Sequence, residues 1–371
     1  MMTGLIVHEW IERVGGAERV LDAFADLAPE ADIYCLWDDA PGRYPRRVIE
    51  SPLSRTPVRG KKALAMPFMP HVWRELRVGE YDWSLISSHL FAHHAQVAGV
   101  TAERKFVYVH TPARYLWEPE LDGRASSWYL RAVAPTFRTI DRHAARRNRN
   151  VAANSKFVRN RIRRVWDTDA TVIYPPVDIS RLSRRGDWRD ALSATEAATF
   201  QALPGTYILG ASRFVPYKAL DRVIDAGAAA GVPVVLAGSG PDETRLRAYA
   251  AESSTPVIFV SRPSDEMVAA LMQHALVYVF PAVEDFGIMP VEAMALGTPV
   301  VVNAVGGASE SMLEDVTGVS VHDFSHESLA SAVTAASRLS GLACRERARE
   351  FSTNRFTSEI RDWMSLSLQP A

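Results

Sequence analysis

Short apolar runs alternate with helix-like patterns along most of the chain, and this alternation constrains the fold more than any other feature. Runs such as TGLIVHEW, KFVYVH, TYILGAS and LVYVFPA have the length and composition of buried strands. Strands separated by helices predict βαβ units, and therefore parallel sheets covered by helices on both faces. We expect an α/β protein.

The strand-like runs fall into two groups, separated by a stretch over 175–204 that carries no strand pattern. A chain of 371 residues is long enough for two domains. We expect an N-terminal Rossmann-like domain over 1–178, a linker or helical insert over 179–203 and a C-terminal Rossmann-like domain over 204–346. The tail, 347–371, has helical periodicity. Its candidate buried residues are Phe351, Phe356, Ile360, Trp363 and Met364.

Composition narrows the class of protein. With 47% hydrophobic and 23% charged residues the chain can fill two cores, which excludes disorder throughout. No apolar run approaches the ~20 residues of a membrane span, and the N-terminus turns to charge after a few apolar residues, unlike a signal peptide. We therefore expect a cytoplasmic protein. Cys35 and Cys344 match no metal or redox spacing, so two free thiols are predicted.

The formal net charge is -1, and we expect no nucleic-acid partner. Between Arg138 and Arg164, however, ten basic residues accompany a single acid, Asp141. Such a run indicates either an anionic partner or a solvated helical face. The sequence alone leaves both interpretations open.

The densest chemical pattern is VFPAVEDFGIMPVEAMALGTPVVVN, residues 279–303. It predicts a strand, the loop EDFGIM, a helix with Pro290 as its first residue, and a second strand. Gly287 permits close approach of the backbone to a ligand, and free N–H groups at a helix N-terminus suit a phosphate. Glu284 and Glu292 lie on the two sides of that terminus. Because two acids at this spacing are common on solvated surfaces, the whole string rather than the pair supports the prediction.

Two cations follow the strand pattern TYILGAS. Arg213 lies in the loop after this strand, and Lys218 precedes the next helix. Open α/β sheets bind ligands at the carboxyl ends of their strands, so both side chains could neutralise charge on a leaving diphosphate. Taken singly, each could also be an ordinary surface residue.

Two features of the N-terminal half also follow strand patterns. Gly15 and Gly16 form a glycine turn, but neither this turn nor GSGPDE has the GxGxxG spacing, so an NAD enzyme is disfavoured. His110 ends the pattern KFVYVH, where a functional and a structural histidine remain alternatives.

Two patterns that resemble metal sites are weak. His89 and His93 are one helical turn apart, but no HExxH motif or third ligand accompanies them. Asp167 and Asp169 match a DxD pattern, yet they lie in a short connection where solvated acids are ordinary. We expect no metal site and no cofactor.

Together, EDFGIMPVEAMALGTPVV, SRFVPYK, LAGSGPD, VGGAERV and VIYPPVD resemble the retaining GT-B glycosyltransferases of family 4, over nearly the whole chain. SSHLFAHHA, VHTPARYLWE, PPVD and VPYK look closest to the bacterial mannosyltransferases of that family that build O-antigen and exopolysaccharide from GDP-mannose. The resemblance implies two Rossmann-like domains facing a central cleft. It also implies a C-terminal helix, from about residue 347, that crosses back to the N-terminal domain.

The resemblance implies side-chain roles as well. Arg213 and Lys218 would bind the donor diphosphate, and Glu284 would lie at the donor sugar. Glu292 would hydrogen-bond the ribose, and His110 would lie near the sugar and the reacting carbon.

Backbone groups complete the implied donor site, with Gly16 bordering the diphosphate and Arg262 lining the base. Two positions depart from the family pattern. Ala219 stands where members often carry Gly or Arg, and Ser261-Arg262-Pro263 replaces a Gly-containing turn. The residues implied to contact the donor in this way are Gly15, Gly16, Arg262, Phe286, Gly287 and Ile288.

The implied activity is metal-independent transfer, with retention, of a hexose from a nucleoside-diphosphate sugar, GDP-mannose preferred, to a glycan or lipid-linked acceptor. A GT-B sugar-nucleotide epimerase and a non-catalytic sugar-nucleotide-binding subunit remain alternatives. The segment 61–77 mixes basic ends with apolar side chains. With the basic run 138–164 it could hold the protein on an anionic membrane surface, or its apolar residues could pack inside the first domain.

Overall fold

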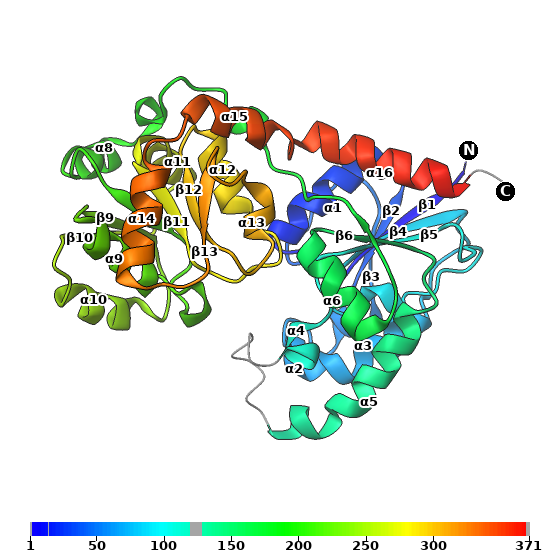
Figure 1. The fold of residues 1–371 in the computed structure, drawn as a ribbon. Helices are drawn as coiled ribbons and strands as arrows, with labels where there is room; N and C mark the ends of the chain where they lie inside the picture. The colour runs from blue at the N-terminus through cyan, green and yellow to red at the C-terminus, as the bar shows by residue number, and fades with distance from the viewer. Residues whose placement is uncertain (1, 14, 119–127, 369–371) are drawn as a thin grey trace. The chain divides into compact units, whose positions relative to one another are not determined.

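A computed structural model describes residues 2–13, 15–118 and 128–368. The chain divides into two compact units, Met1–Pro176 with Thr353–Ala371, and Val177–Ser352. Each unit is built on one parallel sheet (Figure 1). The predicted α/β class with two Rossmann-like units is confirmed.

The first unit contains a seven-stranded sheet in which every pairing is parallel. Its order is β3-β2-β1-β4-β5-β6-β7. The chain therefore adds β2 and β3 on one side of β1, and then β4 to β7 on the other side. The strands are β1 (Gly4–His8), β2 (Asp32–Cys35), β3 (Val48–Glu50), β4 (Trp83–Ser88), β5 (Lys105–Val109), β6 (Asn150–Ala153) and β7 (Thr171–Val172).

Alternate residues of these strands enter two separate cores. Leu5 and Val7 of β1 face one core, whereas Ile6 faces the other. A strand buried on both faces loses polar alternation, which explains the continuous apolar runs of the sequence. The helices of this unit are α1 (Gly16–Leu27), α2 (Lys62–Ala65), α3 (Met69–Arg74), α4 (Arg114–Trp117), α5 (Trp128–Ala145), α6 (Lys156–Trp166) and α16 (Thr353–Leu368).

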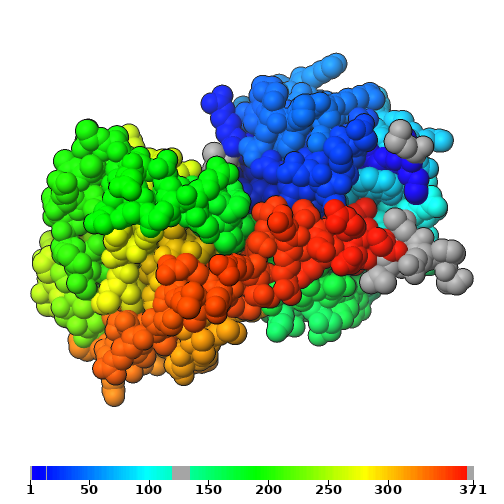
Figure 2. All heavy atoms as spheres, turned by 90° about the horizontal axis from the view of Figure 1, so that it is seen from above, coloured from blue at the N-terminus to red at the C-terminus, as the bar shows by residue number. Residues whose placement is uncertain are grey.

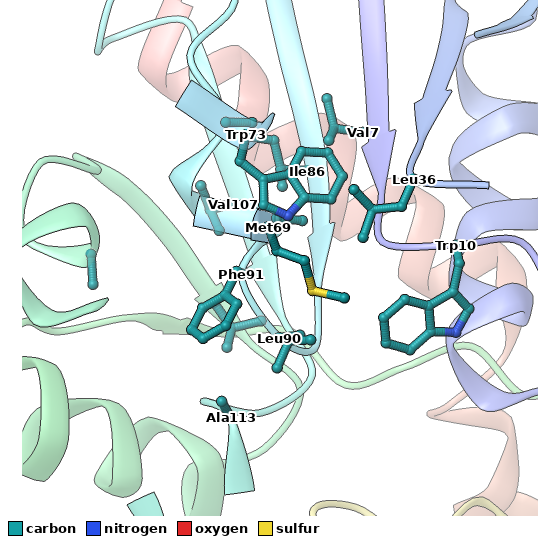
Figure 3. Close-up of a cluster of buried hydrophobic side chains, with 14 of the residues drawn as sticks. Val7, Trp10, Leu36, Met69, Trp73, Ile86, Leu90, Phe91, Val107 and Ala113 are labelled. Carbon is teal, nitrogen blue, oxygen red and sulfur yellow. The ribbon is translucent and has the colours of Figure 1, made fainter. Parts of the chain in front are cut away.

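The first core lies between the sheet and the short helices after β3. Figure 3 shows Met69 and Trp73 of α3 beside Ile86 of β4 and Val7 of β1. Both α3 side chains are fully buried.

The second core joins the two ends of the first unit's sequence. Phe356 of α16 stacks on Phe24 of α1 at a centroid distance of 5.8 Å and meets the Tyr108 ring edge-on at 5.6 Å. Figure 2 shows the red α16 lying against the blue N-terminal residues. The crossing helix begins at Thr353 rather than near 347, because α15 (Gly341–Arg349) ends before it and stays in the second unit. As predicted, Phe351, Phe356, Ile360 and Trp363 are buried, and Met364 is partly buried.

The second unit contains a six-stranded parallel sheet in the order β10-β9-β8-β11-β12-β13. Its strands are β8 (Ile208–Ala211), β9 (Val234–Gly238), β10 (Val257–Ser261), β11 (Val277–Phe280), β12 (Val300–Asn303) and β13 (Gly318–Val321). Its longer helices are α9 (Asp221–Ala230), α10 (Glu243–Ala251), α11 (Asp265–His274), α12 (Ile288–Ala295), α14 (His326–Ala336) and α15.

The stretch 179–203 is helical and belongs to the second unit. It contains α7 (Ile179–Leu182) and α8 (Ala194–Gln201), with a 3-10 turn between them. Ser193 and Glu196 form a reciprocal capping box, which fixes where α8 begins.

Both cysteines are buried free thiols, as the sequence predicts. In the part of the chain that the structure describes, every helix is too short or too polar to span a bilayer.

Replacing Phe356 by Ala should lower the free energy of unfolding of the first unit by about 3–5 kcal/mol, because it removes an aromatic side chain from a closed core. The exposed Arg361 on the same helix provides a control, since Arg361→Ala should change stability by less than about 0.5 kcal/mol. Urea unfolding followed by tryptophan fluorescence measures both. Equal small effects would show that α16 is not part of this core.

Candidate functional site

In the second unit, the strand order predicts that a ligand binds at the carboxyl ends of β8 and β11. The chain runs from β8 towards β9 on one side and from β11 towards β12 on the other. Loops leaving the carboxyl ends of two such strands diverge, which opens a crevice suited to ligands. Arg213 and Lys218 follow β8, and Glu284 follows β11.

An ion pair joins these two loops. Lys218 Nζ donates to Glu284 Oε1 at 2.7 Å, although 66 residues separate the two in sequence. The side chains are 14% and 19% exposed, so the pair is partly shielded from water and still reachable. Lys218 also lies 5.5 Å from the centroid of the Phe280 ring, at the end of β11. The structure thus brings together two of the predicted site residues.

Arg213 extends the positive charge into solvent. Its side chain is exposed, and its Nη2 donates to the hydroxyl of Tyr217 at 3.2 Å. A short 3-10 turn, Pro216–Lys218, then ends at Ala219, whose φ is +50°. This left-handed conformation is one that glycine adopts without strain, so the alanine occupies a backbone position suited to Gly.

The loop 284–287 ends at the N-terminus of α12. Gly287 has φ +85° and caps this helix without a side-chain hydrogen bond. A Cβ on Gly287 would lie only 3.0 Å from Ala308 Cβ, so both the conformation and the space favour glycine. Gly307 N donates to Glu284 O at 2.8 Å, which fixes the loop against the turn after β12. Glu284 precedes α12 closely in sequence. The first N–H groups of this helix therefore lie at the same sheet edge as the Lys218–Glu284 pair.

The other predicted residues of this motif differ in exposure. Ile288 is partly exposed and begins α12, whereas Glu292 is a buried carboxyl one turn further along. Phe286 is also buried and packs on Phe351 at 5.4 Å, so its side chain belongs to the core. Only the backbone of Phe286 is suited to a ligand.

Arg262 lies at the carboxyl end of β10. Its side chain is exposed, its φ is +50°, and its N–H donates to Gly238 O at 3.1 Å. Arg262 thus holds a left-handed backbone conformation that favours glycine, at a cost of roughly 1 kcal/mol in backbone strain.

In the first unit, the equivalent edge lies where β1 and β4 pair. His110 follows β5, and its Nε2 is 2.8 Å from Ser87 Oγ on β4. Gly15 caps α1, and a Cβ there would lie 2.0 Å from Glu18 Oε2, so a side chain at 15 would displace this carboxylate. Gly16 is exposed and begins α1.

His89 also lies at this edge, and sequence reasoning missed it there. It directly follows β4, lies 3.3 Å from Glu9 Oε2 through its Nδ1, and contacts the Trp10 ring edge-on. His8 ends β1 next to it. The signal that could have found these residues is that HEW and SSH both follow apolar runs, as VHTP does.

One cluster in the described residues has the composition of a metal site, and it contains His93 but not His89. The Nε2 atoms of His93 and His94 each lie 3.1 Å from Asp141 Oδ1. The other oxygen, Oδ2, accepts 2.7 Å hydrogen bonds from the indole N–H groups of Trp117 and Trp166. Because both oxygens have partners within the protein, the cluster is explained as the contact that holds α5 in place.

The basic run of α5 and α6 is largely engaged in local ion pairs. Arg159 and Arg163 both donate to Asp169, and Arg146 donates to Asp167. The two acids of the DxD pattern therefore balance part of the run. This favours the solvated-face interpretation for the arginines concerned.

The segment 61–77 contributes to both the core and the surface. Met66, Met69 and Trp73 are buried in the first core. Leu64 and Phe68 are more than half exposed.

Two family models match successive parts of the chain. The model "Glycosyltransferase Family 4" matches residues 14–181, and "Glycosyl transferases group 1" matches residues 198–355. The chain belongs to the group 1 and family 4 glycosyltransferases. The second match contains the Lys218–Glu284 pair and α12, and the first contains His89 and His110.

Relatives with assigned names match only part of the chain. A D-inositol 3-phosphate glycosyltransferase of Mycobacterium avium is 36% identical over 166 residues, which cover 42% of this chain and 38% of that protein. An uncharacterized glycosyltransferase of Methanocaldococcus jannaschii is 38% identical over 100 residues, 26% of each chain. The matched region thus spans less than half the length of these relatives.

Solved structures match over nearly the whole length. Anabaena HepE in complex with UDP superposes with a TM-score of 0.70 at 19% identity, covering 98% of this chain and 100% of that one. HepE in complex with UDP-glucose superposes with a TM-score of 0.66 at 20% identity, over 99% and 100%. Sucrose-phosphate synthase from Thermosynechococcus elongatus gives a TM-score of 0.69 at 19% identity, over 99% of both chains. At this identity the likeness establishes the GT-B type of fold.

The buried His94 predicts a specific loss of stability in acid. Burial, and next the neighbouring His93, lowers the pKa of His94 from 6.5 to about 4. Between these values the unfolded chain binds a proton that the native chain does not, so stability falls as the pH decreases from 6.5 to 4. His94→Gln should remove roughly 3 kcal/mol of this loss.

Urea unfolding at pH 7 and pH 4.5 measures this difference. His143→Gln, on the exposed face of α5, is the matched control and should keep the wild-type pH dependence. A pH dependence in His94→Gln equal to that of the wild type would show that folding does not lower the pKa of His94.

Proposed function

We propose that the protein transfers a hexose, with mannose preferred, from a nucleoside-diphosphate sugar to a glycan or lipid-linked acceptor, with retention of configuration. The observation that supports this most strongly is the Lys218–Glu284 pair at the β8–β11 edge, next to the glycine-capped N-terminus of α12. A cation, free backbone N–H groups and a carboxylate are the groups needed to hold a diphosphate and a sugar hydroxyl.

Lys218 and Arg213 would act on the leaving group. As the bond from the sugar to the diphosphate breaks, negative charge grows on the β-phosphate, and fixed cations stabilise that charge without a metal. The Lys218 ammonium has three N–H donors, of which Glu284 occupies one in the described structure. It can therefore bind a phosphate oxygen while keeping Glu284 oriented.

Glu284 and the backbone of α12 would position the donor. The Glu284 carboxylate is suited to accept hydrogen bonds from sugar hydroxyls, and the N–H groups of Gly287 and Ile288 are suited to phosphate oxygens. Glu292 would accept from the ribose, and the exposed turn at Arg262 would lie along the base. Gly15 and Gly16 would leave room for the diphosphate, and His110 would lie at the sugar.

The donor is proposed from the motif resemblance, which favours GDP-mannose. HepE, which shares the fold, has been solved with UDP-glucose. A donor assay must therefore include both nucleotides. Retention follows from attack by the acceptor on the face that the leaving group departs, with the β-phosphate taking the acceptor proton.

A peripheral contact with an anionic membrane is proposed for the acceptor side, now centred on Leu64 and Phe68. Both are exposed apolar side chains, and the exposed Lys61 is next to them. Apolar insertion beside basic charge favours anionic lipid surfaces. The run 138–164 supports this contact less, because several of its arginines are paired with acids.

The transfer reaction is tested by mixing sugar nucleotides with glycan and lipid-linked acceptors and measuring release of the nucleoside diphosphate. Lys218→Ala and Arg213→Ala should each lower kcat by about 100-fold while raising the donor KM by a few-fold, because their interactions strengthen in the transition state. EDTA should leave the activity unchanged.

Arg222→Ala is the matched control, since Arg222 is an exposed arginine of the same sheet edge region that pairs with Asp225. It should retain wild-type kinetics. Activity that is lost in EDTA and restored by Mn²⁺, or full activity in Lys218→Ala, would contradict the proposal.

A further inference from the structure

A chain of buried polar contacts runs through the first unit and ends at His110. His8 Nδ1 lies 3.0 Å from Ser87 Oγ, and the same Oγ lies 2.8 Å from His110 Nε2. On the other side of the chain, His8 Nε2 lies 3.9 Å from Glu18 Oε1. Ser87 therefore links two imidazoles that come from β1 and from the end of β5.

Everything behind His110 in this chain is closed to solvent. His8 and Ser87 are 0% exposed and Glu18 is 3% exposed, whereas His110 itself is partly exposed. Glu18 Oε1 also accepts from Glu12 N at 3.2 Å. The contacts and burial together lower the pKa of Glu18: burial alone raises it, but His8 and backbone N–H groups outweigh burial and bring it to about 2. Glu18 is thus a carboxylate at neutral pH.

The Glu18 carboxylate decides where the proton of His8 lies. A carboxylate accepts and cannot donate, so a bare His8 Nε2 facing it would place two lone pairs against each other. The distance of 3.9 Å from His8 Nε2 to Glu18 Oε1 is much longer than that of a charge-assisted hydrogen bond, which is about 2.7–2.9 Å. In a neutral His8 the proton therefore lies on Nε2, facing the carboxylate.

The remaining proton positions follow from this one. With Nε2 protonated, His8 Nδ1 is an acceptor, so the Ser87 hydroxyl donates to it. That hydroxyl has a single proton, and its oxygen is then left to accept from His110 Nε2–H. Burial lowers the pKa of His110 well below its ordinary value, so its imidazole is neutral. The other ring nitrogen, Nδ1, then bears the lone pair.

We propose that Glu18, His8 and Ser87 are positioning residues that hold His110 in the Nε2–H tautomer, with Nδ1 presented as a hydrogen-bond acceptor. Among the described residues Nδ1 has no hydrogen-bond partner. It is thus available to a hydroxyl of a sugar substrate and cannot itself donate to a phosphate. The kinetic consequence of this inference rests on the proposed transfer reaction, whereas the tautomer does not.

The direct test is the long-range ¹H–¹⁵N spectrum of the full-length protein labelled with ¹⁵N-histidine, recorded at pH 8. His110→Gln identifies the resonances of His110 by their disappearance. We expect a protonated, pyrrole-type Nε2 and an unprotonated, pyridine-type Nδ1. A wild-type spectrum with the proton on Nδ1 of His110 would overturn the proposal, whatever the variants do.

Ser87→Ala should shift His110 towards a mixture of tautomers, because it removes the acceptor of Nε2–H. Ser84→Ala is the matched control, since Ser84 is a fully buried serine of the same strand whose hydroxyl has no hydrogen-bond partner in the described part of the chain. It should leave the His110 resonances unchanged. Unchanged resonances in a folded Ser87→Ala protein would also overturn the proposal.

Rescue at position 8 separates orientation from packing. His8→Asn keeps a side-chain acceptor close to the place of Nδ1 and should retain the His110 tautomer, whereas His8→Leu should lose it. If His8→Leu kept the wild-type tautomer of His110, His8 would not be one of the residues that position His110.

In the transfer assay, Ser87→Ala should lower kcat by about tenfold with little change in donor KM, since one hydrogen bond that orients His110 is lost. A loss confined to KM would contradict positioning. Absence of any transfer by the wild type would refute the proposed function. The spectrum would then still test whether Glu18, His8 and Ser87 hold His110 in the Nε2–H tautomer.

Discussion

Parallel strands that are buried on both faces place the main constraint on this molecule. Each sheet needs helices on both sides, so its faces are filled with apolar side chains and only its edges and strand ends can hold polar chemistry. The first unit completes one face with α16, supplied by the far end of the chain. The candidate site residues of both units then lie where parallel strands end, at the β1–β4 and β8–β11 edges.

The polar groups at the two edges differ in their exposure to solvent. In the second unit the charges are partly exposed, and Lys218 has N–H donors left for a ligand besides its contact with Glu284. In the first unit His8, Ser87 and Glu18 are closed to solvent, whereas His110 and His89 are partly exposed. A partly exposed pair suits binding of a charged ligand, whereas a closed hydrogen-bond chain suits the orientation of one ring.

The features that could be predicted from the sequence are those set by neighbouring residues. Apolar periodicity predicted the strands, and the string 279–303 predicted β11 and a helix after it. This helix, α12, begins at Ile288 and is capped by Gly287, whereas the sequence predicted its start at Pro290. Contacts between distant residues could not be predicted. Lys218 and Glu284 are 66 residues apart, and Ser87 meets His8 across 79 residues and His110 across 23, because strand order rather than sequence order makes them neighbours.

Charge and conformation show the same limit. Composition counts the arginines of 138–164, but it does not show that Asp167 and Asp169 neutralise several of them. The left-handed backbone at Ala219 and Arg262 is also invisible to residue preference, since neither residue favours it. In both places tertiary contacts, and not local preference, determine the structure.

The claim that the β8–β11 edge binds a nucleoside diphosphate is tested most directly by amide NMR of the ¹⁵N-labelled protein during titration with GDP and with UDP. We expect saturable shifts of the Gly287 and Ile288 amides at the N-terminus of α12, together with shifts around Lys218, and a loss of these shifts in Lys218→Ala. Saturable binding that leaves the Gly287 and Ile288 amides unmoved, or no binding of either nucleotide, would contradict it.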